Sequence, residues 1–342
     1  MKKIRIAVIA GGPSSEREVS LRSGQQILEK LDSARYERTL IEIGKDGTWR
    51  LGAGMQRSSN KALVQPTAPT LSRSNLQAVC DVAFIALHGT YGEDGRVQAI
   101  LDLLGFTYTG SNVLASALGM NKAFAARLVQ NTGQTCPKSV LVHPDTSDSS
   151  IAKVATDLGL PCVVKPNESG SSVGISIVNT SIDLTAAVRK ARAESTDVLV
   201  MEYIKGREFT CGVLGNTGQT KLVALPPVEI VVEQGFFDYS SKYTDGLARE
   251  LCPAPIDKAL EARITSAAVQ AHETLGCDGL TRSDFILGND NKLYFLEINT
   301  IPGMTAQSLC PKEAAASGMS YSQLLDQIID LAIQRRGKAA NK

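Results

Sequence analysis

The chain has 342 residues, more than one compact hydrophobic core usually serves, and this length predicts two or three folded units. Hydrophobic residues make up 43% and charged residues 21%, and a formal net charge of +1 argues against a dedicated nucleic-acid binder or a polybasic membrane protein. The seven cysteines lack metal-ligand spacing and no apolar run reaches the roughly 18–20 residues of a membrane span, so we expect a reduced, cytoplasmic protein without membrane or nucleic-acid partners.

The first third of the chain predicts a small open α/β unit. Ile4–Ala10 is apolar on both faces, as a central parallel strand should be, and a glycine-rich turn then leads into a helical pattern that begins near Ser15. Two more strands are expected at 39–43 and 81–87, and a helix at 97–104. Residues 44–78, which are rich in Gly, Ser, Asn and Pro, are interpreted as a surface excursion.

Two further segments alternate between strand and helix patterns, and each is expected to build its own sheet. The first has a helix at 121–130, strands at 140–142, 162–165, 175–178 and 198–201, and helices near 149–159 and 182–193. The second has strands at 208–214, 222–225, 285–287 and 293–298, and helices near 256–275 and 320–335. We therefore divide the chain into residues 1–110, 111–204 and 205–342.

Two carboxylates, an amide and an arginine near the C-terminal end form the clearest chemical constellation. The turn residues Asp290-Asn291 predict that the strands on either side form a hairpin. Alternation then places Glu297 and Asn299 on one face, and pairing brings Arg282 and Asp284 beside them. Such oxygen ligands suit Mg²⁺, which also takes phosphate oxygens from a substrate. The alternative is a solvated hairpin edge with ordinary surface charges.

The segment from Lys165 to Gly174 is expected to be a loop between two strands. Its small residues let backbone N–H groups approach a phosphate, and Lys165 can add a positive charge. Lys122 stands at a predicted helix start, where a cation opposes the helix dipole at a small cost that a bound anion can offset. The alternatives are a flexible turn and a solvated surface lysine.

Residues Glu202, Tyr203 and Ile204 lie in a short linker between two predicted strands. A linker between two sheets suits an adenine ring, because its backbone groups can read the edge of the base. Glu208, just beyond the linker, can then take ribose hydroxyls. A plain interdomain connection is the alternative.

Glu16 and His88 each follow a predicted strand of the first unit. Glu16 opens a helix, where an acid gains up to about 1 kcal/mol from the helix dipole, so it can serve as a cap or as a ligand contact. His88 lies in a loop just outside a buried strand, the edge where open sheets bind ligands, although a single histidine is more often structural.

Taken together, these segments resemble the D-alanine–D-alanine ligases, in order and nearly from end to end. The matching stretches include GGPSSEREVSLRSG, ALHGTYGEDGRVQAILDLLGFTYTGS, VVKPNESGSSVGIS, EYIKGREFTCGVLG, FDYSSKYTDG, GLTRSDFIL and FLEINTIPGMTAQSLCPKEAAASG. The resemblance implies an α/β protein, α+β overall, with the ATP-grasp fold: three subdomains in which an N-terminal open parallel sheet adjoins two sheets that clamp ATP. It also implies a homodimer.

The resemblance implies ATP-dependent ligation of two D-alanine molecules to D-alanyl-D-alanine, a precursor of peptidoglycan. A D-alanyl phosphate would be the intermediate, and ADP and phosphate would be released. Transfer of the phosphoryl group needs positioning and charge neutralisation by cations. The tetrahedral oxyanion that follows needs hydrogen-bond donors.

The resemblance also assigns roles to individual residues. Lys122 and Lys165 would contact the ATP phosphates, Glu202, Tyr203 and Ile204 the adenine, and Glu208 the ribose, while Asp284, Glu297 and Asn299 would bind two Mg²⁺ ions or Mn²⁺. Glu16, supported by Ser171, would receive the ammonium of the first D-alanine, with His88 also at the substrate site; Arg282 and the Gly303 N–H would face the reacting carboxylate. Ser308 and Leu309 would hold the second D-alanine, with Lys242 nearby, and Tyr243 would close a lid onto Glu16 and Ser171.

Three alternatives stand beside this hypothesis. Another ATP-grasp ligase, acting on different amino or hydroxy acids, would share the nucleotide and metal residues and differ only around the substrates. A nucleotide-binding regulatory protein with degenerate catalysis is disfavoured by the intact cluster of Arg282, Asp284, Glu297 and Asn299. A Rossmann dehydrogenase is a poor match, because the first loop reads GGPSSE and not GxGxxG, and a hydrolase lacks its GxSxG elbow.

Overall fold

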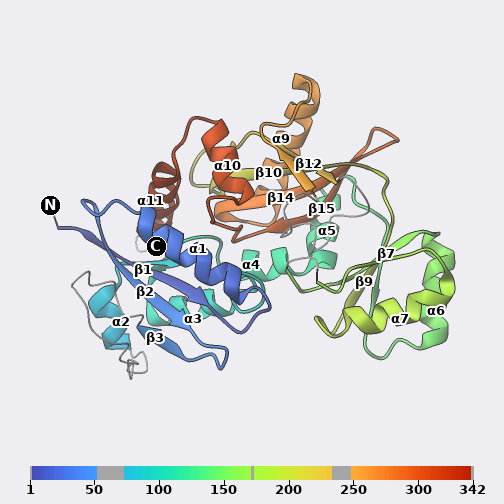
Figure 1. Ribbon diagram of the computed structural model, residues 1–342, viewed down its shortest axis with the longest axis horizontal. Coiled ribbons are helices and arrows are strands. Elements are labelled where there is room, and N and C mark those ends of the chain that lie inside the picture. The colour runs from blue at the N-terminus through green and yellow to red at the C-terminus, as the bar shows by residue number, and fades with distance from the viewer. Residues whose placement is uncertain (1, 52–72, 171–172, 233–247, 340–342) are drawn as a thin grey trace.

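The computed structural model describes residues 2–51, 73–170, 173–232 and 248–339, which form three β-sheets with helices packed on them (Figure 1). The N-terminal sheet and the central sheet lie towards opposite ends of the longest axis, and the C-terminal sheet lies between them (Figure 1). Within these ranges no helix is both long and apolar enough to span a bilayer. The mixed architecture of several sheets confirms the predicted α/β class.

The N-terminal sheet has the strand order β3-β2-β1-β4-β5. Its elements are β1 (Ile4–Gly11), α1 (Arg17–Lys30), β2 (Tyr36–Ile43), β3 (Trp49–Leu51), α2 (Arg73–Val79), β4 (Val82–Ile85), α3 (Arg96–Leu104) and β5 (Thr107–Tyr108). β1 pairs in parallel with β2 and β4, and its residues 6–10 are fully buried. The predicted central parallel strand is therefore confirmed.

The interpretation of residues 44–78 as a surface excursion was wrong at both ends of the segment. β3 pairs antiparallel with β2, Trp49 and Leu51 pack against the core of the sheet, and Leu76 of α2 is 2% exposed. The polar composition was misleading because a few apolar side chains suffice to dock a short element on an existing core. Residues 52–72 lie outside the described part of the chain.

The central sheet is antiparallel, with the order β6-β9-β7-β8. Its elements match the predictions with small shifts of their ends: β6 (Ser139–Val142), α6 (Asp148–Leu158), β7 (Cys162–Pro166), β8 (Ser176–Val178), α7 (Ser181–Ala191) and β9 (Val198–Glu202). Cys162 and Val164 belong to the core under α6 and α7, so alternation turns Val163 and Lys165 to the opposite face. That face looks towards the C-terminal sheet.

The C-terminal sheet has the order β13-β12-β10-β14-β15, with β11 paired to β10. Its strands are β10 (Gly206–Asn216), β11 (Val223–Ala224), β12 (Val228–Val232), β13 (Ala248–Leu251), β14 (Asp278–Gly288) and β15 (Leu293–Asn299). The helices around it are α4 (Val113–Met120), α5 (Lys122–Gln130), α9 (Lys258–Thr274), α10 (Leu309–Ala316) and α11 (Tyr321–Ala339). α4 and α5 share the core of this sheet with α9, although they precede the central sheet in the sequence.

Several elements of the C-terminal sheet and of the helices around it differ from the predictions. β12, β13, α4 and α10 were not predicted, and β14 was predicted to start at residue 285, whereas the strand begins at Asp278. Thr281 and Ser283 are fully buried in the first half of β14. Their polarity concealed a central strand: the Thr281 hydroxyl lies 2.7 Å from Nδ1 of His272, whereas the buried Ser283 hydroxyl has no hydrogen-bond partner among the described residues.

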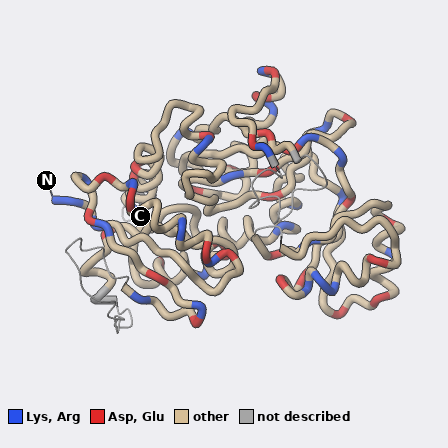
Figure 2. The backbone as a smooth tube through the Cα atoms, viewed as in Figure 1, with Lys and Arg blue, Asp and Glu red and all other residues tan. Residues whose placement is uncertain are grey.

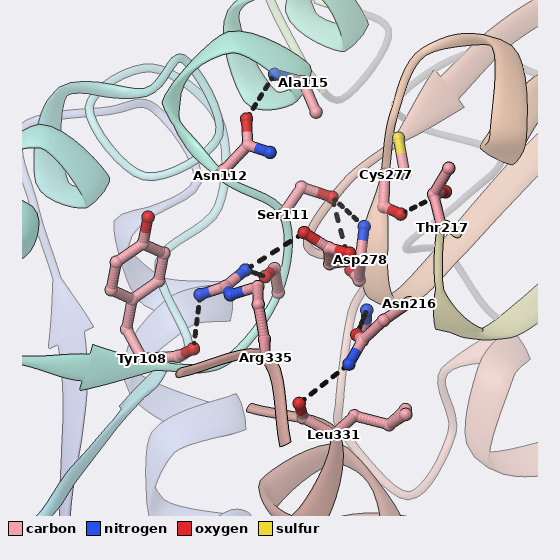
Figure 3. Close-up of polar contacts among 12 residues, drawn as sticks. Tyr108, Ser111, Asn112, Ala115, Asn216, Thr217, Cys277, Asp278, Leu331 and Arg335 are labelled. Carbon is pink, nitrogen blue, oxygen red and sulfur yellow. Dashed lines mark hydrogen bonds and ion pairs between the residues drawn. The ribbon is translucent and has the colours of Figure 1, made fainter. Parts of the chain in front are cut away.

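A polar network joins the N-terminal sheet to the C-terminal sheet through α11 (Figure 3). The Arg335 guanidinium donates to the carbonyl oxygens of Gly110 and, at 2.8 Å, Tyr108, and it lies 4.4 Å from the centre of the Tyr108 ring. Its Nη1 is 3.5 Å from Oδ2 of Asp278 at the start of β14. Asn216 of β10 donates to the carbonyl oxygen of Leu331 at 2.8 Å. These contacts connect the N-terminal sheet to the C-terminal sheet.

Candidate active site

A cavity of about 990 Å³ is lined by strands of the central and C-terminal sheets, by α1, and by the loops that follow β1 and β4 of the N-terminal sheet. Every predicted site residue within the described ranges lines it: Glu16, His88, Lys122, Lys165, Glu202, Tyr203, Ile204, Glu208, Arg282, Asp284, Glu297, Asn299, Gly303, Ser308 and Leu309. Ser171, Lys242 and Tyr243 lie outside those ranges. Figure 2 marks the positions of basic and acidic residues along the backbone, and both kinds occur in the C-terminal sheet.

The hairpin of β14 and β15 carries four of these side chains. Asp284 stands opposite Glu297 and Arg282 opposite Asn299, as the predicted hairpin requires, with an irregularity between Asp284 and Phe285. Arg282 binds Asp284 through two parallel hydrogen bonds, Nε to Oδ1 at 2.9 Å and Nη2 to Oδ2 at 3.0 Å. Burial by itself would lower the pKa of the Arg282 guanidinium, but Asp284 outweighs this and raises it. Arg282 is therefore a permanent cation.

Two lysines from different elements converge on Glu297. Lys165 at the end of β7 places Nζ 3.4 Å from Oε2 of Glu297, and Lys122 at the start of α5 places Nζ 3.7 Å from the same oxygen. The lysines are only 5% and 7% exposed. Burial lowers the pKa of Lys165, and the neighbouring charge of Lys122 adds to this while Glu297 opposes it. This pair of buried cations is suited to an anion larger than one carboxylate.

The charges of the cluster do not balance. Lys122, Lys165 and Arg282 contribute three positive charges, and Asp284 and Glu297 contribute two negative charges. One positive charge is left over within these five side chains, although Glu16 and Glu93 also line the cavity. An anionic ligand accompanied by a divalent cation would complete the site.

The donor set also fits a divalent cation. Asp284 and Glu297 offer carboxylate oxygens and Asn299 an amide oxygen, which is the chemistry that Mg²⁺ accepts when substrate phosphate supplies further ligands. Across the described ranges, no three His, Cys, Asp or Glu side chains are grouped so that they could hold a metal by themselves. Any further ligands of a metal ion at this hairpin would come from a phosphate or from water.

The linker from Glu202 to Ile204 joins the central sheet to the C-terminal sheet, as predicted. Glu202 exchanges two hydrogen bonds with Lys138: its N–H donates to the lysine carbonyl at 2.9 Å, and its Oε1 accepts from the lysine N–H at 2.8 Å. The Glu202 carboxylate therefore binds the backbone of Lys138, the residue just before β6. Tyr203 and Ile204 are half-buried along the cavity, and Glu208 follows them on β10.

At the other end of the cavity, Glu16 lies between the loops that carry Gly89 and Gly170. A side chain on Gly170 would collide with the Glu16 carboxylate, and one on Gly89 would come within 2.7 Å of Oε2. Glu16 precedes α1, but its side chain makes no capping hydrogen bond. The capping alternative is therefore wrong, and the carboxylate faces the cavity.

His88 is fully buried and both of its ring nitrogens are engaged. Nε2 lies 2.9 Å from the Ser23 hydroxyl, and Nδ1 lies 3.1 Å from the carbonyl oxygen of Ile301. Burial lowers the pKa of His88 to about 4. The ring is therefore neutral near pH 7, and it ties α1 to the loop that leads to Gly303.

The sequence analysis missed Glu93, which is 5% exposed beside Glu16 and Arg282. Its carboxylate accepts from the N–H of Gly89 at 2.6 Å and of Ile301 at 3.3 Å. Burial, aided by the charge of Glu16, raises the pKa of Glu93 to about 8. The residue stands in the same loop as His88, but no pattern in the sequence distinguishes it from its neighbour Asp94.

The start of α10 closes this end of the cavity. Ser308 precedes the helix, its Oγ accepts from the Thr305 N–H at 3.0 Å, and Leu309 begins the first turn. A helix N-terminus presents free N–H groups that bind anions such as a carboxylate. Gly303 lies against Ser308, since a side chain there would come within 2.9 Å of the serine Oγ.

Comparisons with known proteins agree over the whole chain. The family model described as "D-ala D-ala ligase N-terminus" matches residues 5–111, and the one described as "D-ala D-ala ligase C-terminus" matches residues 128–330. The D-alanine–D-alanine ligase of Desulfotalea psychrophila is 42% identical over 98% of both chains, and that of Geobacter sulfurreducens is 39% identical over 99% of this chain and 98% of the relative.

Two solved structures are similar throughout. The D-alanine–D-alanine ligase of Coxiella burnetii superposes with a TM-score of 0.85 at 31% identity, covering 100% of this chain and 97% of the other. The VanG D-Ala:D-Ser ligase of Enterococcus faecalis gives 0.82 at 34% identity, covering 97% and 100%.

Proposed function

The chain belongs to the D-alanine–D-alanine ligase family, and we infer that it is an ADP-forming carbon–nitrogen ligase that joins two D-alanine molecules for cell-wall synthesis. Its fold is the ATP-grasp fold of these ligases. The observation that carries the inference is the gathering of the described candidate residues around one cavity, where two buried lysines converge on Glu297 of the β14–β15 hairpin. ATP and a divalent metal ion are the partners that the family requires.

We propose that the ATP phosphates lie between the two lysines and the β14–β15 hairpin. Lys122 and Lys165 would release Glu297 and bind phosphate oxygens, while Asp284, Glu297 and Asn299 hold two Mg²⁺ ions, or Mn²⁺. These ions would neutralise the charge that develops on the transferred phosphoryl group. Both lysines are already buried in the cavity, so their contact with Glu297 is what would have to change when ATP binds.

We propose that adenine lies along the linker between the sheets, which supports it on one edge of the cavity. Tyr203 and Ile204 would contact the ring, and Glu202 would support the linker through its bonds to Lys138. Glu208 would take the ribose hydroxyls. The division of the chain at residues 1–110, 111–204 and 205–342 would then put the nucleotide between the second and third units.

The first half-reaction would activate the first D-alanine. Its ammonium would be held by Glu16 beside the buried Glu93, and its carboxylate would attack the γ-phosphorus of ATP. The bond from this phosphorus to the bridging oxygen breaks, ADP leaves, and a D-alanyl phosphate remains. Arg282 would orient the carboxylate, because its guanidinium is buried and permanently charged.

The second half-reaction would form the peptide bond. The amine of the second D-alanine attacks the carbonyl carbon, and the resulting oxyanion is stabilised by Arg282 and the Gly303 N–H. The second carboxylate would lie at the N-terminus of α10, against Ser308 and Leu309. Phosphate then leaves, carrying one oxygen from the first carboxylate.

Ser171, Lys242 and Tyr243, which are outside the described residues, would complete the substrate site as the resemblance implies. His88 would contact the substrate or orient its loop. We further propose that the chain forms a homodimer and acts in the cytoplasm.

The proposal is tested by phosphate release from ATP and Mg²⁺ with D-alanine, L-alanine, D-alanine plus D-lactate, or D-alanine plus D-serine, with each product identified by mass. We expect turnover with D-alanine and none with L-alanine. The D-serine arm examines the activity named for the VanG relative. Absence of D-alanine-dependent turnover would contradict the proposed function.

A further inference from the structure

Glu313 on α10 is a fully buried carboxyl group beside the active site, and the proposed reaction does not use it. Its Oε1 accepts a hydrogen bond from the N–H of Gly212 at 3.2 Å. Its Oε2 is buried and has no hydrogen-bond partner among the described residues. Burying a carboxylate without pairing both oxygens is costly, so this group calls for a physical explanation.

The position of Glu313 is defined by the strand pairing. Gly212 of β10 stands directly opposite Arg282 of β14. Opposed residues of an antiparallel pair point to the same face with their Cβ atoms about 5 Å apart. A Cβ on Gly212 would lie 2.6 Å from Oε2 of Glu313. The carboxyl group therefore occupies the space of the missing side chain, next to the stem of Arg282.

Arg282 thus lies between two acids that differ in their hydrogen bonding. On one side it makes two hydrogen bonds to Asp284; on the other lies the incompletely paired Glu313. Burial raises the pKa of Glu313 to about 7, while the guanidinium of Arg282 and the thiol of Cys310 oppose that rise. Both hydrogen bonds that Arg282 makes to a carboxylate go to Asp284.

The proposed metal role of Asp284 changes this balance. Oxygens that bind a divalent cation are less available to Arg282, whose side chain is only 14% exposed. A buried guanidinium that loses its counter-charge must find another or move. Among the described residues around it, Glu313 offers the oxygen Oε2, which accepts no N–H or O–H hydrogen bond and has only the weakly donating Cys310 thiol nearby.

We propose that Glu313 is a positioning residue for Arg282, providing the second buried carboxylate that holds the guanidinium when a metal ion engages Asp284. This inference rests on the proposed function, in which Asp284 binds metal and Arg282 faces the reacting carboxylate. Glu313 keeps Arg282 in place without competing for the metal. It also links Arg282 to α10, the helix whose N-terminus would hold the second substrate.

The test is Glu313→Gln, which keeps an acceptor for the Gly212 N–H and nearly the same shape but removes the charge. Two quantities are measured: kcat, and the Mg²⁺ concentration that half-saturates ADP binding in calorimetry. We expect kcat to fall about tenfold, less than the 10²–10³ typical of a lost oxyanion donor. We expect the half-saturating Mg²⁺ concentration to rise several-fold, because Arg282 then competes more strongly for Asp284. Values of both within twofold of the wild type would overturn the inference.

Asp278→Asn is the matched control, because Asp278 is also a buried acid paired with an arginine (Figure 3) but is not among the residues that line the cavity. It should lower the melting temperature and leave kcat and the Mg²⁺ dependence unchanged. If it changed both as Glu313→Gln does, the effect would be a general one of buried acids and the inference would fail.

Two further variants separate the possible failures. If Arg282→Met retained full activity, both the proposed role of Arg282 and the inference about Glu313 would be wrong. If Arg282→Met were inactive and Glu313→Gln behaved as the wild type, only the inference about Glu313 would be wrong. Should Glu313→Gln not fold, Gly212→Ala displaces the carboxyl group without removing its charge. It should reduce kcat and raise the Mg²⁺ requirement, and wild-type behaviour would overturn the inference.

Discussion

Replacing Lys165 by methionine separates the binding role of a buried charge from any structural role. The Lys165 side chain is 7% exposed, and its nearest anionic partner is Oε2 of Glu297 at 3.4 Å. Burial lowers its pKa, so the folded protein disfavours the charged form in the absence of ligand. Methionine is unbranched, similar in length and apolar, so it can fill the same space.

We expect Lys165→Met to leave the stability of the fold nearly unchanged or to increase it, and to weaken nucleotide binding. A volume-conserving substitution usually costs less than about 1.5 kcal/mol, and here removing a disfavoured charge offsets that cost, so the free energy of unfolding should stay within about 1 kcal/mol of the wild type or increase. A charge-assisted hydrogen bond to phosphate contributes about 1.5–3 kcal/mol. Its loss should weaken ATP binding about 10- to 150-fold.

Calorimetry with ADP and Mg²⁺ measures the binding, and thermal unfolding without nucleotide measures the stability. Lys190→Met is the control, because Lys190 lies on the exposed side of α7 in the same unit as Lys165. It should change neither quantity. A Lys165→Met protein that bound nucleotide normally but unfolded several degrees lower would show that the lysine is structural and refute the reasoning.

Three further predictions concern the metal site, the interdomain network and a buried histidine. Glu297→Gln should lower turnover more than about 100-fold with an unchanged melting temperature; near-normal phosphate release would exclude Glu297 as a metal ligand. Arg335→Met breaks a mostly buried ion pair and its contact with Tyr108, and in urea unfolding it should cost about 3 kcal/mol while kcat stays within twofold; a large loss of kcat would contradict this. Burial lowers the pKa of His272 to about 4, so only the unfolded chain takes up a proton as the pH falls below about 6.5. Between pH 6.5 and 4, the free energy of unfolding of the wild type should therefore fall by up to about 3 kcal/mol more than that of His272→Gln. If thermal unfolding gave the same pH dependence for both proteins, this prediction would be wrong.

The elements that could be predicted from the sequence are those whose burial leaves a periodic pattern. β1 is apolar on both faces because helices cover both sides of a parallel sheet, and the β14–β15 hairpin is marked by its turn at Asp290-Asn291. α10 was missed because Leu309, Cys310 and Pro311 at its start resemble a loop, although proline is compatible with the first turn of a helix. The first half of β14 was missed because its buried residues include hydroxyls.

The candidate site could be predicted in its members but not in its balance of charges. Glu297 was recognised from the hairpin that it shares with Asp284, whereas its approach to Lys122 and Lys165 depends on how three separate elements pack. Glu93 was missed for a different reason. The sequence does not show whether an acidic residue is buried or exposed to solvent. The raised pKa of Glu93 depends on the packing of other segments around it.

The most direct test of the account follows one oxygen atom. D-alanine labelled with oxygen-18 in its carboxylate is incubated with ATP, Mg²⁺ and the enzyme, and the released phosphate and the product are analysed by mass. The account predicts D-alanyl-D-alanine and phosphate in equal amounts, with one labelled oxygen in each phosphate and none in ADP. Unlabelled phosphate, or phosphate released at the same rate without D-alanine, would contradict it.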